Sequence, residues 1–183
     1  MLHILKFFKT AVFDYVHVGA VTPTSKYVTR KILSEIPADA KYIVEYGPGD
    51  GAVTREVLKK LPSDGKLVAI EINDKFVAEL GKIKDPRFRI IKGNIIDWSK
   101  KIDELNLPQV DAVLSNVPML HFKLNDRKTV IENTYKFVKP GGRYITWQYS
   151  LSLKPIIKNV FKNFRYLYEI RNIPPYFIII GEK

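Results

Sequence analysis

The stretch YIVEYGPGDGAV, residues 42–53, places three glycines within five positions directly after a short apolar run. The run is rich in Val and Ile, as buried β-strands are, and a helical apolar pattern begins at Ala52. Gly47, Gly49 and Gly51 allow a tight turn and the close approach of a ligand, while the start of the helix offers unpaired N–H groups. The stretch therefore predicts a strand, a loop and a helix that form a site for a nucleotide-type ligand.

The chain on either side repeats this alternation of strand and helix. Short runs rich in Val and Ile predict buried parallel strands at 41–46, 66–72, 87–93 and 110–116. Apolar residues spaced three and four apart predict helices at 52–61, 73–83, 97–105 and 125–138. Alternating strands and helices, joined by right-handed crossovers, predict an α/β fold with a Rossmann-like, doubly wound sheet.

The C-terminal part predicts how the sheet ends. The glycine pair in KPGG, residues 139–142, is expected to end the fourth helix and to turn into a fifth strand at 143–151. A basic-faced helix should follow, marked by Lys154, Lys158 and Lys162. The last two apolar runs, 164–172 and 176–183, are too close together for a crossover helix, so we expect an antiparallel hairpin. The prediction is a seven-stranded sheet that is mostly parallel, with an antiparallel C-terminal strand.

Length and composition limit the possible classes of protein. We expect the 183 residues to form a single domain, 1–183, with an N-terminal amphipathic helical segment at 1–35. This segment either caps the core or lies in a membrane interface, and no run of about 18 apolar residues is present to span a bilayer. Without cysteine, and with three scattered histidines, neither a disulfide framework nor a metal site is predicted. A cytoplasmic location is expected.

The formal net charge of +11 indicates an anionic partner. A nucleic acid such as RNA and an anionic membrane surface both satisfy this condition. Charge alone does not choose between them, and it does not predict an oligomeric state.

Two glutamates bear on the identity of the ligand. The loop Gly47-x-Gly49-x-x-Ala52 fits the dinucleotide fingerprint, with Glu71 about 20 residues further on, so a nicotinamide cofactor is one alternative. Glu45, however, stands two residues before the first glycine, where a buried carboxylate would repel a pyrophosphate. A carboxylate suits a cofactor that carries a cationic amino acid moiety and no phosphate. S-adenosylmethionine is such a cofactor.

Residues 41–183 resemble the class I methyltransferases. VEYGPGDG matches their E-x-G-x-G-x-G motif, Glu71 in VAIEIN matches the acid that binds both ribose hydroxyls, and the terminal hairpin matches their seventh strand. Asn94 in KGNIID stands where that family often has an aspartate on the adenine amine, and its amide oxygen can accept the same bond. The resemblance implies S-adenosyl-L-methionine as the cofactor. The cofactor-binding residues that it implies are Thr22, Ser25, Glu45, Gly47, Gly49, Gly51, Glu71, Ile72, Asn94, Ile95 and Ser115.

The loop SNVPML, residues 115–120, resembles loops of two kinds of methyltransferase. In adenine amine methyltransferases, including the ribosomal RNA adenine dimethylases, the loop reads N-[IL]-P-[YF], and Asn116 and Pro118 fit that pattern. Met119 stands where the base-stacking aromatic ring belongs, and a thioether does not supply the roughly 1–3 kcal/mol that stacking contributes. An RNA adenine N-methyltransferase is therefore kept as an alternative. A catalytically silent, Rossmann-like module that binds nucleic acid is another.

Four local stretches resemble the bacterial phospholipid N-methyltransferases, which methylate phosphatidylethanolamine. They are VGAVTPTS at 18–25, SNVPML at 115–120, QYSLSLKP at 148–155 and RNIPPYF at 171–177, in the order and spacing of that family. The resemblance implies an N-methyltransferase that acts on a phospholipid amine and is peripherally associated with the membrane. Basic residues near an anionic membrane favour such an association.

Transfer of a methyl group to an amine requires that nitrogen and methyl be held in line and that the amine be unprotonated. We predict that Asn116 orients the amine and that Tyr149 hydrogen-bonds the amine or the lipid phosphate. His121 is predicted to relay the proton. Tyr149 could instead be a wall of the pocket, and His121 a loop residue without chemistry. The number of methyl groups added stays open.

Overall fold

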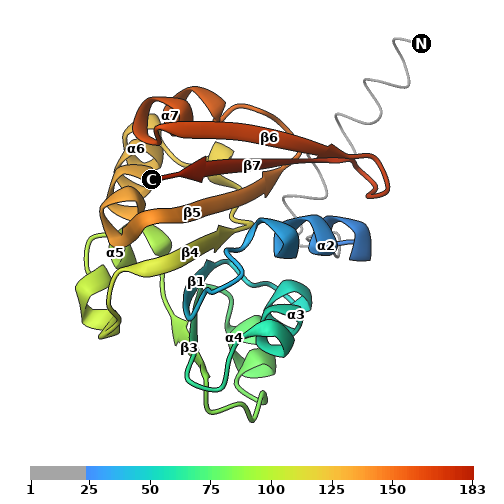
Figure 1. The fold of residues 1–183 in the computed structure, drawn as a ribbon, viewed down its shortest axis with the longest axis vertical. Coiled ribbons are helices and arrows are strands. Elements are labelled where there is room, and N and C mark those ends of the chain that lie inside the picture. Colours follow the sequence, from blue (N-terminus) through green and yellow to red (C-terminus); the bar gives the residue numbers. More distant parts are fainter. Residues whose placement is uncertain (1–23) are drawn as a thin grey trace.

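The computed structural model describes residues 24–183, which form one seven-stranded sheet with the strand order β3-β2-β1-β4-β5-β7-β6 (Figure 1). The strands are β1 Tyr42–Tyr46, β2 Lys66–Glu71, β3 Phe88–Lys92, β4 Val110–Ser115, β5 Val138–Gln148, β6 Asn163–Glu169 and β7 Tyr176–Glu182. The pairs among β1 to β5 are parallel, and β7 runs antiparallel to both β5 and β6. The predicted Rossmann-like fold is confirmed, including the terminal hairpin. The predicted helical turns before residue 24, and Thr22, lie outside the described residues.

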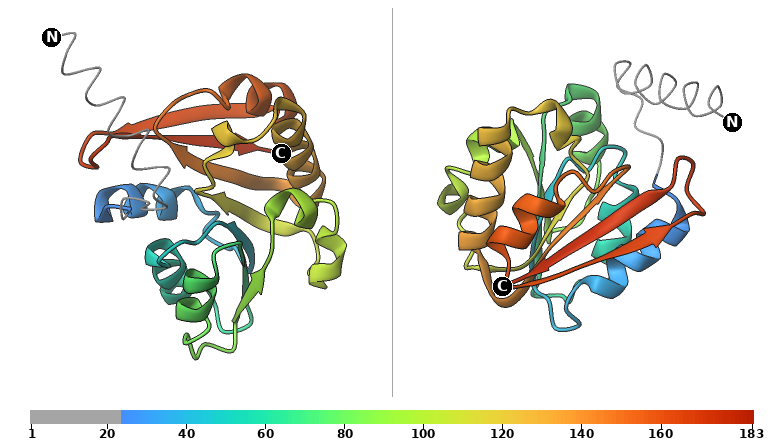
Figure 2. Two further views of the ribbon diagram at one scale, coloured as in Figure 1. Left: turned by 180° about the vertical axis from the view of Figure 1, so that it is seen from behind. Right: turned by 90° about the horizontal axis from the view of Figure 1, so that it is seen from above.

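Helices cover both faces of the sheet (Figure 2). The helices are α2 Lys26–Glu35, α3 Ala52–Lys60, α4 Asp74–Leu80, α5 Ile95–Trp98, α6 Leu124–Phe137 and α7 Lys154–Val160, with short 3-10 turns η1 Ile102–Leu105 and η2 Met119–His121. One face packs against α2 and α3, and the other against α5, α6 and α7. Strand and helix alternate from β1 to α7, which places the loop after each parallel strand at one common edge, the carboxyl edge of the sheet.

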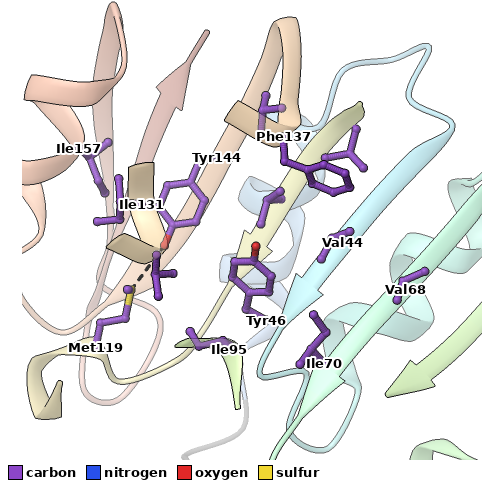
Figure 3. Packing of buried hydrophobic residues seen from close by; sticks show 14 of the residues in the cluster. Val44, Tyr46, Val68, Ile70, Ile95, Met119, Ile131, Phe137, Tyr144 and Ile157 are labelled. Atoms are coloured by element: carbon purple, nitrogen blue, oxygen red, sulfur yellow. Dashed lines mark hydrogen bonds between the residues drawn. The ribbon is translucent and has the colours of Figure 1, made fainter. Parts of the chain in front are cut away.

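The core consists of one apolar layer on each face. On the side of α6, Tyr46 and Tyr144 are fully buried, and their rings stand among aliphatic side chains such as Val44 (Figure 3). The Tyr46 hydroxyl lies 3.3 Å from Thr134 Oγ1, so the phenol at the end of β1 has a polar partner on α6. On the side of α2 and α3, the largest buried side chain is Trp147. The packing of both apolar layers thus fixes the strands whose carboxyl ends carry the loops of this edge.

The predicted helix at 97–105 is wrong as a continuous element. Asn94 caps α5 by accepting from Ile96 N, and the helix ends after one turn, where Ser99 Oγ donates to Ile96 O. A separate turn, η1, then buries Leu105. Apolar residues three and four apart fit two short turns as well as one longer helix.

Two other boundaries differ from the sequence prediction. KPGG at 139–142 does not precede the fifth strand but lies within β5, where the register with β4 shifts. Gly141 N donates to Lys183 O and Lys183 N donates to Gly142 O, so the glycines pair with the C-terminal residue. The predicted basic-faced helix is shorter than expected, because α7 ends at Val160 and Lys162 lies beyond it.

Candidate active site

The glycine loop after β1 approaches the loops of neighbouring strands closely. Gly47, Gly49 and Gly51 all have positive φ, at 67°, 57° and 77°. A Cβ atom on Gly47 would lie 2.7 Å from Val117 Cγ2, and one on Gly51 would lie 2.4 Å from Leu80 Cδ2. At Gly49 a Cβ atom would meet nothing within 4 Å. The loop is therefore packed at both ends and exposes bare backbone to open space at its centre, where a ligand can approach.

Glu71 ends β2 directly beside this loop, and only 6% of its surface is exposed. Its Oε1 accepts hydrogen bonds from Ile72 N and Asn73 N at 2.9 and 2.8 Å, and its Oε2 accepts from Gly49 N at 3.2 Å. A carboxylate offers about four acceptor positions. Three N–H donors therefore fix the direction of the group, and Oε2 keeps acceptor capacity at the rim of the loop.

Glu45 is the second acid of the site and is 1% exposed on β1. Thr54 Oγ1, on α3, donates to its Oε2 at 2.7 Å. Burial raises the pKa of Glu45 to about 7, and the negative charges of Glu71 and Asp50 act in the same direction, whereas the bond from Thr54 opposes them. The glycine loop thus lies over two acids, one of which is only partly ionised near neutral pH. A cationic ligand would relieve that repulsion, and a phosphate would increase it.

Four other predicted cofactor residues occupy different environments. Ile72 is 64% exposed at the end of β2, and Asn94 caps α5, which is a sufficient structural reason for an asparagine there. Ile95 and Ser115 are buried in the core below the edge. Ser115 Oγ lies near the Tyr144 hydroxyl but makes no hydrogen bond of ordinary geometry within the described part of the chain.

Tyr176, at the start of β7, joins two predicted catalytic residues. Its ring stacks on Tyr149 with centroids 4.4 Å apart, and its hydroxyl donates to Tyr149 Oη at 2.9 Å. Burial and then this hydrogen bond raise the pKa of Tyr176 far above its usual value, although the side chain of Asn116 acts in the opposite direction. The structure therefore brings Asn116 and Tyr149 together around Tyr176. The three side chains form a polar cluster, hereafter the acceptor cluster.

Gln148 holds the loop that carries Asn116. Its Nε2 donates to Val117 O at 2.7 Å from the end of β5, and Asn116 N donates to Tyr46 O at 3.1 Å. Val117 in turn contacts the glycine loop at Gly47. The acceptor cluster and the glycine loop are thus connected across β1 and β4, which is the point where the strand order reverses and where ligands bind in open α/β sheets.

The other predicted residues lie further out on the same edge. Ser25 caps α2 by accepting from Val28 N, and its own N–H donates to the buried side chain of Asn172 in the turn between β6 and β7. His121 lies on η2 with an exposed side chain. The predicted roles of Ser25 in cofactor binding and of His121 in proton transfer stay predictions.

Sequence reasoning missed Tyr176 and Gln148. Tyr176 lies in RNIPPYF, a stretch singled out by resemblance, yet nothing in the sequence indicates that an antiparallel strand begins beside Tyr149. Gln148 is the last residue of a buried strand, where a polar side chain is a usable signal because it requires a partner.

No metal centre or membrane span accompanies this site within the described residues. Between residues 24 and 183, no group of three or more His, Cys, Asp or Glu side chains is placed to hold a metal ion. None of the helices described there has the length and apolar character needed to cross a bilayer.

Comparisons with known proteins agree with this geometry. The sequence profile of a family described as a methyltransferase domain matches residues 43–142, which include the glycine loop, both acids and Asn116. An ornithine lipid N-methyltransferase from Singulisphaera acidiphila is 22% identical over 166 residues, covering 86% of this chain and 84% of that protein.

Two solved structures with the same fold are methyltransferases by name. An O-methyltransferase from Bacillus cereus, crystallised with SAH, superposes with a TM-score of 0.71 at 15% identity, covering 96% of this chain and 90% of its own. The N-methyltransferase NodS from Bradyrhizobium japonicum gives a TM-score of 0.69 at 12% identity, covering 88% of this chain and 97% of its own. At these identities the likeness extends to the fold alone.

Proposed function

The chain belongs to the methyltransferase domain family, and we propose that it is an S-adenosylmethionine-dependent N-methyltransferase whose acceptor is the amine of a membrane phospholipid. The single observation that carries the proposal is the pair of buried acids, Glu45 and Glu71, beside the glycine loop. Glu71 alone would suit the ribose of either kind of cofactor, but with Glu45 present a dinucleotide would place its pyrophosphate close to two acids, at an electrostatic cost. A cofactor with an ammonium group and a sulfonium group meets them with opposite charge.

The residues present fit S-adenosylmethionine. Glu71 keeps acceptor capacity on Oε2 for a ribose hydroxyl, and Gly49 leaves open space in front of the loop. Glu45 supplies the negative charge for the amino acid end, and Ile72 offers an exposed apolar surface one residue beyond Glu71. Methyltransferases of the same fold from Bacillus cereus and Streptomyces achromogenes were crystallised with SAH and SAM, which supports the same cofactor for this chain.

A lipid acceptor is supported by the curated relative, whose name gives an ornithine lipid as its substrate. Phosphatidylethanolamine and an ornithine lipid share the chemistry that matters here, a head-group amine. An RNA base as acceptor is less favoured, because Met119, at the position of the stacking ring, is fully buried in the core and receives the Tyr144 hydroxyl at 3.7 Å. No aromatic ring takes its place in that loop segment, SNVPML.

When bound, S-adenosylmethionine supplies a methyl group on a positively charged sulfur, which an unprotonated amine can attack. The acceptor cluster provides oxygens that can receive the N–H bonds of the amine: the side-chain carbonyl of Asn116 and the hydroxyl of Tyr149. Because Tyr176 donates to Tyr149, the hydroxyl oxygen of Tyr149 is held in one direction within the acceptor cluster. Holding the amine in this way would account for most of the rate enhancement expected of such a site.

The test is to incubate the protein with methyl-labelled S-adenosylmethionine and, separately, total lipid or total RNA. We expect label in the lipid fraction and, by mass spectrometry, methylated head-group amines. Label confined to RNA would overturn the lipid acceptor and leave the methyltransferase activity in place.

A matched pair of variants tests the cofactor site directly. Glu71→Gln should weaken cofactor binding by about 10-fold or more in calorimetry, because hydrogen bonds to a charged acceptor contribute about 1.5–3 kcal/mol. Glu79→Gln, on the exposed side of α4, should bind as wild type does. Equal affinity in both variants would remove Glu71 from the site.

A further inference from the structure

The tip of the β6–β7 hairpin exposes two large aliphatic side chains at the carboxyl edge. Ile170 is 67% exposed and Ile173 is 79% exposed, and both lie in the turn at 170–175. Figure 1 shows this tip at the end of the hairpin that points away from α6 and α7, next to α2. Folding alone does not explain two isoleucines in this position, because neither packs into the core.

The other exposed apolar side chains of the described residues fit the same surface. The remaining large exposed aliphatic residues follow the ends of parallel strands at the same edge: Ile72, Leu120 and Leu124. Along β6, Tyr166 and Tyr168 are half exposed and lie against Phe177. Aliphatic side chains at a tip with tyrosines behind them form the arrangement expected of an element that enters a membrane interface.

The charges beside the tip are predominantly positive. The guanidinium of Arg171 lies 4.2 Å from the ring centroid of Tyr27, and Lys26 lies over the same ring. Lys31 and Arg171 both pair with the buried carboxylate of Glu169, so the cations near the tip outnumber the acid that they share. This balance complements an anionic surface.

We propose that the hairpin tip, through Ile170 and Ile173, inserts into the head-group region of an anionic bilayer and sets the acceptor cluster against the lipid. Tyr176 follows the turn directly and contacts Tyr149, so a docked tip would hold the acceptor cluster close to the membrane surface. The inference rests on the proposed function, because docking to a membrane serves the reaction only if the methyl acceptor is a lipid. Its test nevertheless requires no methyl transfer.

The test uses the full chain and vesicles that contain no amine acceptor: phosphatidylcholine alone, or phosphatidylcholine with phosphatidylglycerol. We expect binding to the anionic vesicles in a flotation assay, and we expect the double variant Ile170→Ser, Ile173→Ser to bind at least about 10-fold more weakly. Cofactor binding by calorimetry checks that this variant is folded. Undiminished vesicle binding by the double variant would overturn the proposal, as would no binding by the wild type.

A pair of tryptophan variants locates the membrane contact by a change in fluorescence, without relying on a loss of vesicle binding. Ile173→Trp should shift its emission to shorter wavelength when anionic vesicles are added. The control Ser63→Trp, in the exposed turn between α3 and β2 at the opposite edge, should not shift. Equal emission shifts of the two tryptophan variants would overturn the proposal. A wild-type dimer that becomes a monomer in the double variant would also overturn it, because the tip would then be an interface between copies of this chain.

The two proposals fail separately. Tip-dependent vesicle binding with no methylated lipid would leave the docking surface and remove the lipid acceptor. Methylated lipid with tip-independent vesicle binding would leave the acceptor and remove the docking surface.

Discussion

Glu45 links the stability of the protein to its cofactor site. Its folded-state pKa of about 7 lies above the ordinary value of 4.5, first because of burial, so the folded protein holds this proton more tightly than the unfolded chain. The resulting cost to stability is absent below pH about 4.5, grows as the pH rises, and is complete above pH about 7. We expect Glu45→Gln to raise the free energy of unfolding by about 3 kcal/mol above pH about 8 and to change it little near pH 4.

Urea unfolding of both proteins across this pH range measures the effect. Glu56→Gln, on the partly exposed side of α3, is the matched control and should leave the pH profile unchanged. Calorimetry should show that Glu45→Gln weakens cofactor binding while it stabilises the protein. A pH profile identical to that of wild type would show that Glu45 does not titrate in this range.

Tyr176 is predicted to position Tyr149 rather than to touch the substrate. Tyr176→Phe keeps the stacked ring and removes the hydroxyl that donates to Tyr149 Oη. We expect kcat for the amine acceptor to fall by up to about 10-fold, in line with the loss of one hydrogen bond, with an unchanged Kd for the cofactor. The control Tyr135→Phe, on α6 against Phe161, should keep wild-type kcat. A change confined to the free energy of unfolding would assign Tyr176 a structural role only.

At the scale of elements, Asp111 on β4 connects β1, β4 and β5 at the edge of the sheet opposite the candidate active site. Its Oδ2 accepts from Lys41 N and Tyr42 N at the start of β1, and its Oδ1 pairs with Lys139 on β5. Burial acts to raise the pKa of Asp111, but these donors outweigh it and the pKa is lowered. The carboxylate is therefore ionised in the folded protein and stabilises the junction of β1, β4 and β5.

We expect Asp111→Ala to lower the free energy of unfolding by about 2–4 kcal/mol, because two backbone N–H groups and Lys139 lose their acceptor. Denaturant unfolding measures this as a lower midpoint with an unchanged slope. Asp103→Ala, on the exposed turn η1, should have little effect. The Kd for the cofactor should stay unchanged in both, and a loss of cofactor binding in Asp111→Ala would contradict the separation of the two edges.

Elements were predictable where a local pattern determines them. Each apolar run from 41–46 to 110–116 became a strand within a residue or two. β1, β2 and β4 are almost wholly buried, and burial on both faces requires a continuous apolar sequence. β3 lies at the edge of the sheet and is only partly buried, so the prediction of a buried strand at 87–93 is wrong in that respect. The end of α5 was not predictable from apolar spacing, since it depends on the bonds of Asn94 and Ser99. The place of 139–142 depends on pairing with the C-terminal residue, a partner about 40 positions away in the sequence.

At the scale of the whole molecule, the site follows from topology as much as from motifs. The sequence located the glycine loop, Glu71 and Asn116 at strand ends, and parallel strands bring such ends to one edge. The contact of Tyr176 with Tyr149 depends on β7 inserting between β5 and β6, which no local pattern encodes. The same insertion places the turn at 170–175 beside the acceptor cluster.

The continuity of the sheet predicts that its two halves unfold together. The paired strands β1 and β4 join two halves of the sheet, one with β2 and β3 and the other with β5, β6 and β7. Each half holds one tryptophan: Trp98 lies beside β3, and Trp147 lies in β5. Each of the variants Trp98→Phe and Trp147→Phe keeps one tryptophan, which reports on one half of the sheet. If the chain is one cooperative domain, the fluorescence transition of each variant in urea should coincide with the loss of circular dichroism of the same variant. Trp147→Phe should unfold at lower urea, because Trp147 is buried. If the fluorescence of Trp98 in the Trp147→Phe variant changed at lower urea than the circular dichroism of that variant, the sheet would instead unfold as two units separated at the β1–β4 pair.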